Sequence, residues 1–267
     1  MREASVRWSR GGRVPGALQD GGTGRPPCSC MRLPSSTESL RPRGCPGLAV
    51  FALGVLLTTL RAEPVKLGVD VLQEESFAAL EGKRVGVVVN PASVDGSLRG
   101  TADVLRGTDR CKLVAIFGPE HGVYGDEYAG VRVADRTDAQ TGLRIHSLYG
   151  NTRKPTREML RGLDALVFDL QDIGSRSYTY ISSMRVCLEA CAEAGIDFVV
   201  LDRPNPLGGR RVEGPPGVEK GFESFISQID VPYLHGMTMG ELAQLVKERH
   251  APAYAKLRVV KIGRAHV

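Results

Sequence analysis

The chain has 267 residues, of which 42% are hydrophobic and 24% are charged, and this composition excludes a fibrous or wholly disordered protein. The formal net charge of +5 would indicate a nucleic-acid partner only if the basic residues belonged to the folded part. Residues 1–62 hold nine arginines against three acidic residues, which leaves a charge of −1 for residues 63–267. The charge therefore gives no support to nucleic-acid binding.

The first 62 residues have the composition of a leader. Residues 1–46 are rich in Arg, Gly, Pro and Ser, and a short apolar run at 48–60 follows Arg43 and ends before Ala62. This order is typical of a secretory signal peptide, and the alternative is an uncut membrane anchor. We expect residues 1–30 to precede the true start, 31–62 to be the signal peptide, and the protein to be secreted or periplasmic, with no stable membrane span after cleavage.

The C-terminal residues indicate that the reading frame of the natural protein is interrupted here. Residues 256–261 have the pattern of a strand, and residues 262–267 resemble one reading frame of a common sequencing-adapter oligonucleotide. We therefore expect a catalytic domain at 63–261 that is truncated, and a chain that is inactive as it stands.

From residue 83 onward, short apolar segments alternate with amphipathic ones. The pattern predicts strands at 83–89, 112–117, 165–170 and 197–201. It predicts helices at 97–106, 177–194 and 239–249, the second ending at Gly195 and the third capped by Thr238. Such an alternation is typical of an α/β fold with a parallel sheet that helices cover on both faces. The insertion at 123–151 is expected to hold a small hairpin.

Polar residues follow the end of each predicted strand, which is the edge where open α/β sheets bind ligands. Glu120 and His121 lie on a short loop bracketed by glycines after the second strand. Glu120 could serve as a proton donor if burial keeps it protonated, or it could cap the next segment. His121 could be a ligand, a base or a hydrogen-bonded loop residue.

A second group follows the third strand. Asp169 and Asp172 could hold a metal ion or act as a catalytic pair. Arg176 could clamp a substrate carboxylate, and the alternative is a structural Asp–Arg network. A tyrosine at the start of the next helix could stack on a sugar.

The loop after the fourth strand holds Asp202, Arg203 and Asn205, and its two prolines would present these side chains rigidly. The chain has neither a G-x-G-x-x-G fingerprint nor a Walker A motif, so no nucleotide is expected.

Seven motifs stand in a characteristic order. They are NPASVDG (90–96), FGPEHGVYGDEYAG (117–130), SLYGNTRKPT (147–156), LVFDLQDIGSRSYTYISSM (166–184), VVLDRPNPLGG (199–209), VEGP (212–215) and LHGMTMGELA (234–243). Together they resemble the exo-β-N-acetylmuramidase family over roughly residues 65–261.

The resemblance implies a Rossmann-like domain, a smaller C-terminal domain that is largely missing here, and an active site in the cleft between them. It implies a glycoside hydrolase that releases terminal N-acetylmuramic acid from the non-reducing end of peptidoglycan fragments, so muramyl saccharides are the expected partners and neither a cofactor nor a metal is expected. The catalytic candidates are Glu120, Asp169 and Asp172, and the binding candidates are Asn90, His121, Gln171, Arg176, Tyr178, Asp202, Arg203 and Asn205. The lactyl carboxylate of the sugar calls for a cation, which Arg176 or Arg203 would provide.

Two alternatives come from other functional classes. The first is a metal-dependent periplasmic hydrolase with Glu120, His121, Asp169 and Asp172 as ligands. The second is a sugar-binding module without catalysis.

Overall fold

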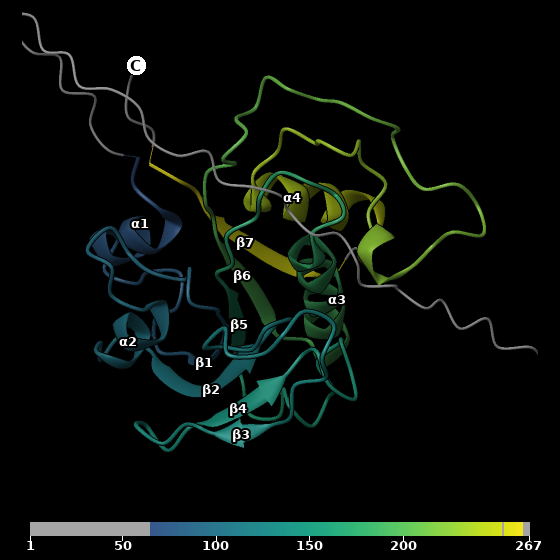
Figure 1. Cartoon of the computed structure of the whole chain (residues 1–267). Coiled ribbons are helices and arrows are strands. Elements are labelled where there is room, and N and C mark those ends of the chain that lie inside the picture. The colour runs from purple at the N-terminus through teal and green to yellow at the C-terminus, as the bar shows by residue number, and fades with distance from the viewer. Residues whose placement is uncertain (1–64, 253, 264–267) are drawn as a thin grey trace, which may run out of the picture. The chain divides into compact units, whose positions relative to one another are not determined.

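The computed structural model describes residues 65–252 and 254–263 (Figure 1). The predicted signal peptide and the leader before it lie outside the described residues, as do the last four residues of the predicted adapter-derived end. Among the described residues, no helix is both long enough and apolar enough to cross a membrane.

A seven-stranded sheet forms the centre of the described part. Its strands are β1 (Arg84–Val88), β2 (Lys112–Gly118), β3 (Arg136–Thr137), β4 (Arg144–Ser147), β5 (Ala165–Phe168), β6 (Asp197–Leu201) and β7 (Lys256–Val260). The spatial order is β3-β4-β2-β1-β5-β6-β7, and every neighbouring pair is parallel except β3 with β4. The predicted α/β fold with a parallel sheet is confirmed.

Helices cover both faces of this sheet (Figure 1). They are α1 (Gly68–Glu74), α2 (Thr101–Arg106), α3 (Thr179–Ala194) and α4 (Met239–Arg249), with a short 3-10 helix at Phe225–Ser227. Residues of α3 and α4 share one hydrophobic cluster, and residues of α1 and α2 belong to a second. Figure 1 places these two pairs of helices on opposite sides of the strands.

The strands are apolar on both faces because each face contributes to one of these clusters. In β5, Leu166 and Phe168 point into the cluster with α3 and α4, whereas Ala165 and Val167 point into the other. All four side chains are fully buried. Such two-sided burial explains why the strands read as continuous Val, Ile and Leu runs rather than as alternating ones.

The predicted ends of the two long helices are also confirmed. Thr238 caps α4, where its hydroxyl accepts a hydrogen bond from the backbone N–H of Glu241 at 3.2 Å. Gly195 ends α3 in the left-handed conformation, at φ 73°, which glycine adopts without steric cost.

Three local predictions need correction. The helix expected at 97–106 begins at Thr101, because Asp95 accepts hydrogen bonds from the backbone N–H groups of Ser97 and Arg99 and folds that stretch into a turn. The short helix α1 was not predicted. The insertion is more than a hairpin, since β4 also pairs in parallel with β2 and so extends the main sheet.

The chain order creates a switch point in the sheet. From β1 the chain moves outward through β2 to β4, and it then returns to the other side of β1 for β5, β6 and β7. The carboxyl ends of β1 and β5 therefore flank the crevice where sheets of this type bind ligands.

Candidate active site

Glu120 lies two residues beyond β2, beside the switch point, and its carboxylate is held by partners from two other segments. One oxygen, Oε1, accepts a hydrogen bond from the backbone N–H of Gly130 at 3.0 Å. The other, Oε2, accepts one from the hydroxyl of Thr179 at the start of α3, at 2.9 Å. The side chain is half-buried rather than buried, so it is both fixed in place and open to a ligand.

Two tyrosines lie near this carboxylate. Desolvation raises the pKa of Tyr149 most, and a hydrogen-bond interaction with Glu120 raises it further. Burial raises the pKa of Tyr180 to about 12. Both phenols therefore keep their protons at neutral pH and can act as hydrogen-bond donors.

Asn90 and Tyr178 belong to the same neighbourhood. The amide of Asn90, just beyond β1, donates a hydrogen bond to the hydroxyl of Tyr180 at 3.0 Å. The rings of Tyr178 and Tyr180 pack edge to face with 4.6 Å between their centroids. The structure thus brings Asn90, Glu120 and Tyr178 together around the first turn of α3.

His121 turns away from this group. Its backbone has a positive φ of 70°, and its Nδ1 lies 3.0 Å from the carbonyl oxygen of Glu127. This geometry matches the hydrogen-bonded loop residue that the sequence left open as one alternative.

Asp169 has a structural environment. It is fully buried, and its carboxylate accepts two hydrogen bonds from Arg203, at 2.5 and 2.9 Å, and a third from the hydroxyl of Thr101 at 2.5 Å. Arg203 also donates to the carbonyl oxygen of Val94 at 2.8 Å. The geometry favours the structural Asp–Arg network, formed with Arg203 rather than Arg176, over a catalytic acid and a substrate clamp.

Asp172 pairs with a residue that the sequence analysis did not identify. Its Oδ2 lies 3.1 Å from Nε2 of His235 and accepts a hydrogen bond from the backbone N–H of Gly174 at 2.7 Å. His235 is buried and accepts a hydrogen bond at Nδ1 from the N–H of Met237, so Nε2 carries the proton that faces Asp172. His235 lies in the quoted motif LHGMTMGELA, but its partner is 63 positions away in the chain.

Three predicted binding residues instead form hydrogen bonds to backbone carbonyl oxygens of the segment 204–237. Arg176 is buried and donates to the carbonyl oxygens of Val231 and Pro215, at 3.0 and 3.3 Å. Gln171 donates to the carbonyl oxygen of Pro204, and Asn205 donates to that of Met237. Because the guanidinium of Arg176 is occupied in this way, the structure gives no support to its predicted role as a carboxylate clamp.

Asp202 caps the start of α4. Its Oδ1 accepts hydrogen bonds from the backbone N–H groups of Gly240 and Arg203, and its Oδ2 accepts one from the hydroxyl of Thr238. Burial raises the pKa of this carboxyl, and these hydrogen bonds oppose the rise. The role of Asp202 in the structure is to join the end of β6 to α4.

The four residues proposed as metal ligands do not lie around a common point where they could bind one metal ion. Glu120 bonds to Gly130 and Thr179, Asp169 to Arg203, Asp172 to His235, and His121 lies against a carbonyl oxygen. Within residues 65–252 and 254–263, no group of three or more His, Cys, Asp or Glu side chains is arranged to hold a metal ion. This geometry contradicts the predicted four-ligand set.

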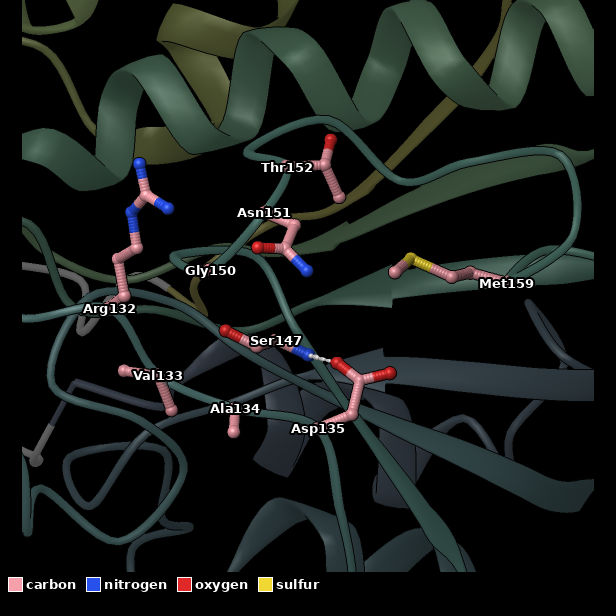
Figure 2. Close-up of a pocket in the computed structure, with 9 residues that line it drawn as sticks. All are labelled: Arg132, Val133, Ala134, Asp135, Ser147, Gly150, Asn151, Thr152 and Met159. Carbon is pink, nitrogen blue, oxygen red and sulfur yellow. Dashed lines mark hydrogen bonds between the residues drawn. The ribbon is translucent and has the colours of Figure 1, made fainter.

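Two cavities lie next to the Glu120 neighbourhood. One, of about 320 Å³, is lined by Gly130 and Tyr149, which both interact with Glu120, and by Arg132, Gly150, Asn151, Thr152 and Arg153. The other, of about 380 Å³, shares four of these residues and extends toward Asp135, Ser147 and Met159 (Figure 2). The motifs FGPEHGVYGDEYAG and SLYGNTRKPT contain some of these lining residues, but none of them was predicted to have a role in the site.

Comparisons with known proteins agree with this architecture. A curated protein from Bacillus subtilis (strain 168), named peptidoglycan beta-N-acetylmuramidase NamZ, is 47% identical over 204 residues, which are 76% of this chain and 49% of that protein. The chain therefore spans about half the length of this relative.

Two crystal structures from Bacteroides fragilis NCTC 9343, both described as DUF1343 family proteins, share the fold. One is 49% identical, with a TM-score of 0.69 over 76% of this chain and 52% of its own. The other is 33% identical, with a TM-score of 0.64 over 76% of this chain and 54% of its own. The family model described as exo-beta-N-acetylmuramidase NamZ, N-terminal, matches residues 85–266. The parallel sheet, the motifs along its carboxyl edge and these matches together show that the chain belongs to the NamZ exo-β-N-acetylmuramidase family.

Proposed function

We propose that the protein is a glycoside hydrolase that releases terminal N-acetylmuramic acid from the non-reducing end of peptidoglycan fragments. Membership of the NamZ family and 47% identity to a protein named peptidoglycan beta-N-acetylmuramidase support this activity. Because the chain spans about half of that relative, the activity is a proposal for the whole protein to which the chain belongs.

The observation that carries the proposal is the placement of Glu120. Its carboxylate is fixed by Gly130 and Thr179, faces Tyr149 and adjoins a cavity of about 320 Å³. Cleavage of a glycosidic bond requires a carboxyl group that protonates the departing oxygen. Among the three catalytic candidates, Asp169 and Asp172 are buried in pairs with Arg203 and His235, which leaves Glu120 as the candidate that a sugar can reach.

In the proposed reaction, Glu120 delivers a proton to the oxygen that links N-acetylmuramic acid to the next sugar, and the bond between this oxygen and the anomeric carbon breaks. Water then supplies the hydroxyl group of the released sugar, and the remaining proton of this water replaces the one that Glu120 gave up. Tyr149 stays protonated next to Glu120 because desolvation and the neighbouring carboxylate raise its pKa. It can therefore hold Glu120 in position through the reaction.

We further propose that the protein is exported. The apolar run at 48–60, after Arg43 and before Ala62, supports a signal peptide that starts at Met31. Fusion of residues 31–62 to a reporter that is active only outside the cytoplasm tests this proposal. Activity of the reporter is the expected result, and retention in the cytoplasm would contradict export.

The activity is tested with a chromogenic N-acetylmuramide and the longest reading frame that contains this chain. We predict that Glu120→Gln lowers kcat by about 10²- to 10⁴-fold, the usual contribution of general acid catalysis, with little change in KM. Glu127→Gln is the matched control, since Glu127 lies on the same loop and its side chain forms no hydrogen bond or ion pair with the described residues of the site; the kcat of this variant should stay at the wild-type value.

Each result separates the proposal from an alternative. No turnover by the wild-type protein, with binding of N-acetylmuramic acid retained, would indicate a sugar-binding module. Turnover that a chelator abolishes would indicate a metal-dependent hydrolase. Wild-type kcat in Glu120→Gln would remove Glu120 as the proton donor.

A further inference from the structure

Arg132 lies where the two cavities beside Glu120 meet. It lines both of them, together with Gly150, Asn151 and Thr152. The cavities measure about 380 and 320 Å³, which is within the range of small-molecule sites in proteins. Arg132 is therefore the charged residue common to both halves of this groove.

The guanidinium of Arg132 has no bonding partner among the described residues. The side chain is exposed, and no residue in the described part of the chain forms an ion pair or a hydrogen bond with it. Figure 2 shows this group extending away from Asp135 and Ser147. The nearby carboxylate of Asp135 is already engaged by the backbone N–H of Ser147 at 2.8 Å and by Arg144 and His146 at 3.4 Å. Arg132 is thus available to an anionic ligand.

The other arginines of the site are engaged. Arg203 is bound to Asp169, and Arg176 to two carbonyl oxygens. Arg153 lies over the rings of Tyr149 and Phe225, with 4.7 and 4.6 Å from its guanidinium carbon to their centroids. Stacking leaves the N–H edge of Arg153 open, so Arg132 and Arg153 are the two cations of the groove, and of these two only Arg132 lines both cavities.

The backbone on either side of Arg132 forms hydrogen bonds with Glu120 and with Tyr149. Gly130, two residues before it, donates its N–H to Glu120, and Val133, directly after it, donates its N–H to the carbonyl oxygen of Tyr149 at 3.0 Å. Tyr149 itself interacts with Glu120. The same short segment therefore positions both the carboxylate and the cation.

The floor of the groove depends on a close backbone approach. A Cβ atom on Gly150 would lie 2.5 Å from the carbonyl oxygen of Val133, a distance that real side chains do not reach, so glycine is required there. This approach brings Asn151 and Thr152 beside Arg132 (Figure 2). Their amide and hydroxyl groups add neutral hydrogen-bonding capacity next to the charge.

We infer that Arg132 binds the lactyl carboxylate of N-acetylmuramic acid and thereby sets the preference of the site for this sugar over N-acetylglucosamine, which lacks that group. The inference rests on the proposed function, since the substrate is the one proposed above. A guanidinium can bind a carboxylate through two parallel hydrogen bonds. Glu120 adjoins the smaller cavity through Gly130 and Tyr149, and Arg132 lines both cavities, so the sugar ring would lie across the segment 149–152.

The test is calorimetric binding of three sugars to the full chain and to variants. The sugars are N-acetylmuramic acid, N-acetylglucosamine and N-acetylglucosamine 6-phosphate. We expect Arg132→Ala to weaken binding of N-acetylmuramic acid by about tenfold or more, as charged hydrogen bonds do, and to leave N-acetylglucosamine unchanged. Arg132→Lys should lose part of this affinity, because lysine keeps the charge without the planar fork.

Arg161→Ala is the matched control. Arg161 is also exposed, but it lies next to Gly162, whose carbonyl oxygen binds Arg84 at the start of β1, and hence at the opposite edge of the sheet. Its removal should change no affinity. Circular dichroism of each variant confirms that the fold is retained.

The outcomes distinguish this inference from the proposed function. An unchanged preference in Arg132→Ala, or a wild-type chain with no preference for N-acetylmuramic acid, would overturn the inference. Equal binding of the 6-phosphate sugar would overturn the assignment to a carboxylate. A preference that depends on Arg132, without hydrolysis by the longer reading frame, would support the inference and contradict the proposed function.

Discussion

At the scale of single residues, the geometry of the buried Asp169–Arg203 pair favours a structural role, because each charge is the fixed partner of the other. Asp169 and Arg203 are 0% and 4% exposed and form two hydrogen bonds with each other. An ion pair at this depth gains little net stability, since both charges lose their hydration, but breaking it leaves an uncompensated charge. The pair therefore locks the loop after β6 to the end of β5.

We predict that Asp169→Asn lowers the free energy of unfolding by about 3–5 kcal/mol, because it leaves Arg203 buried without a counter-ion. Asp103→Asn is the control, since Asp103 forms an exposed ion pair with Arg106 and should lose at most about 1 kcal/mol. Urea unfolding measures both values. A loss for Asp169→Asn no larger than that of the control would show that the Asp169–Arg203 pair is not structural.

At the scale of elements, the hairpin of β3 and β4 is held by one carboxylate. Asp138 accepts hydrogen bonds from the hydroxyl of Thr141 and from that of Tyr124, the latter at 2.6 Å. These two bonds lower the pKa of Asp138, and the bond to Asp138 in turn raises the pKa of Tyr124 to about 12. The hairpin ends close to the cavities, because β4 leads directly into the segment that contains Tyr149 and Gly150.

The lowered pKa of Asp138 makes part of the stability depend on pH. Since the carboxyl binds its proton less tightly in the folded state, its contribution is fully present above its unfolded pKa of about 3.9 and is lost as the pH falls through the folded value. We predict that Asp138→Asn costs about 1 kcal/mol at pH 7 and that this difference shrinks below about pH 4.

Thermal unfolding of wild type and Asp138→Asn between pH 7 and pH 3 checks this prediction. Asp109→Asn serves as the control, because Asp109 is exposed. A stability difference that stays constant down to pH 3 would contradict the role assigned to Asp138.

Two differences between the expected and the observed elements have different causes, one local and one tertiary. The stretch 97–100 has helical character in the sequence, but Asp95 binds the N–H groups of Ser97 and Arg99 and holds them in a turn. The segment that forms β4 has the alternating pattern of a hairpin strand, yet it pairs in parallel with β2. The turn at Asp95 is a local signal that competes with the helix, whereas the pairing of β4 with β2 cannot be identified from the local pattern.

At the scale of the whole molecule, both hydrophobic clusters of the described part are built from residues between Val69 and Val260. We predict that the amide hydrogens of β1, β5 and β6 exchange slowly with solvent, because these strands pair with neighbours on both sides and contribute to both clusters. Rapid exchange in these three strands would contradict this expectation.

The sequence by itself determined the fold class, the four central strands, the two long helices with their caps, and the edge of the sheet where the site lies. These features depend on local periodicity and on single capping residues, which any stretch of the chain displays on its own. The sequence also predicted that Asn90 and Glu120 lie at the same edge of the sheet, and the parallel pairing of β1 with β2 confirms this.

Only the tertiary structure decided which polar residues are structural and which are free. Arg203 meets Asp169 across 34 positions and His235 meets Asp172 across 63, whereas Arg132, which the sequence did not single out, remains available beside Glu120. The physical reason is that burial follows a local repeat, but the pairing of charges depends on which distant segments the fold brings within hydrogen-bond distance.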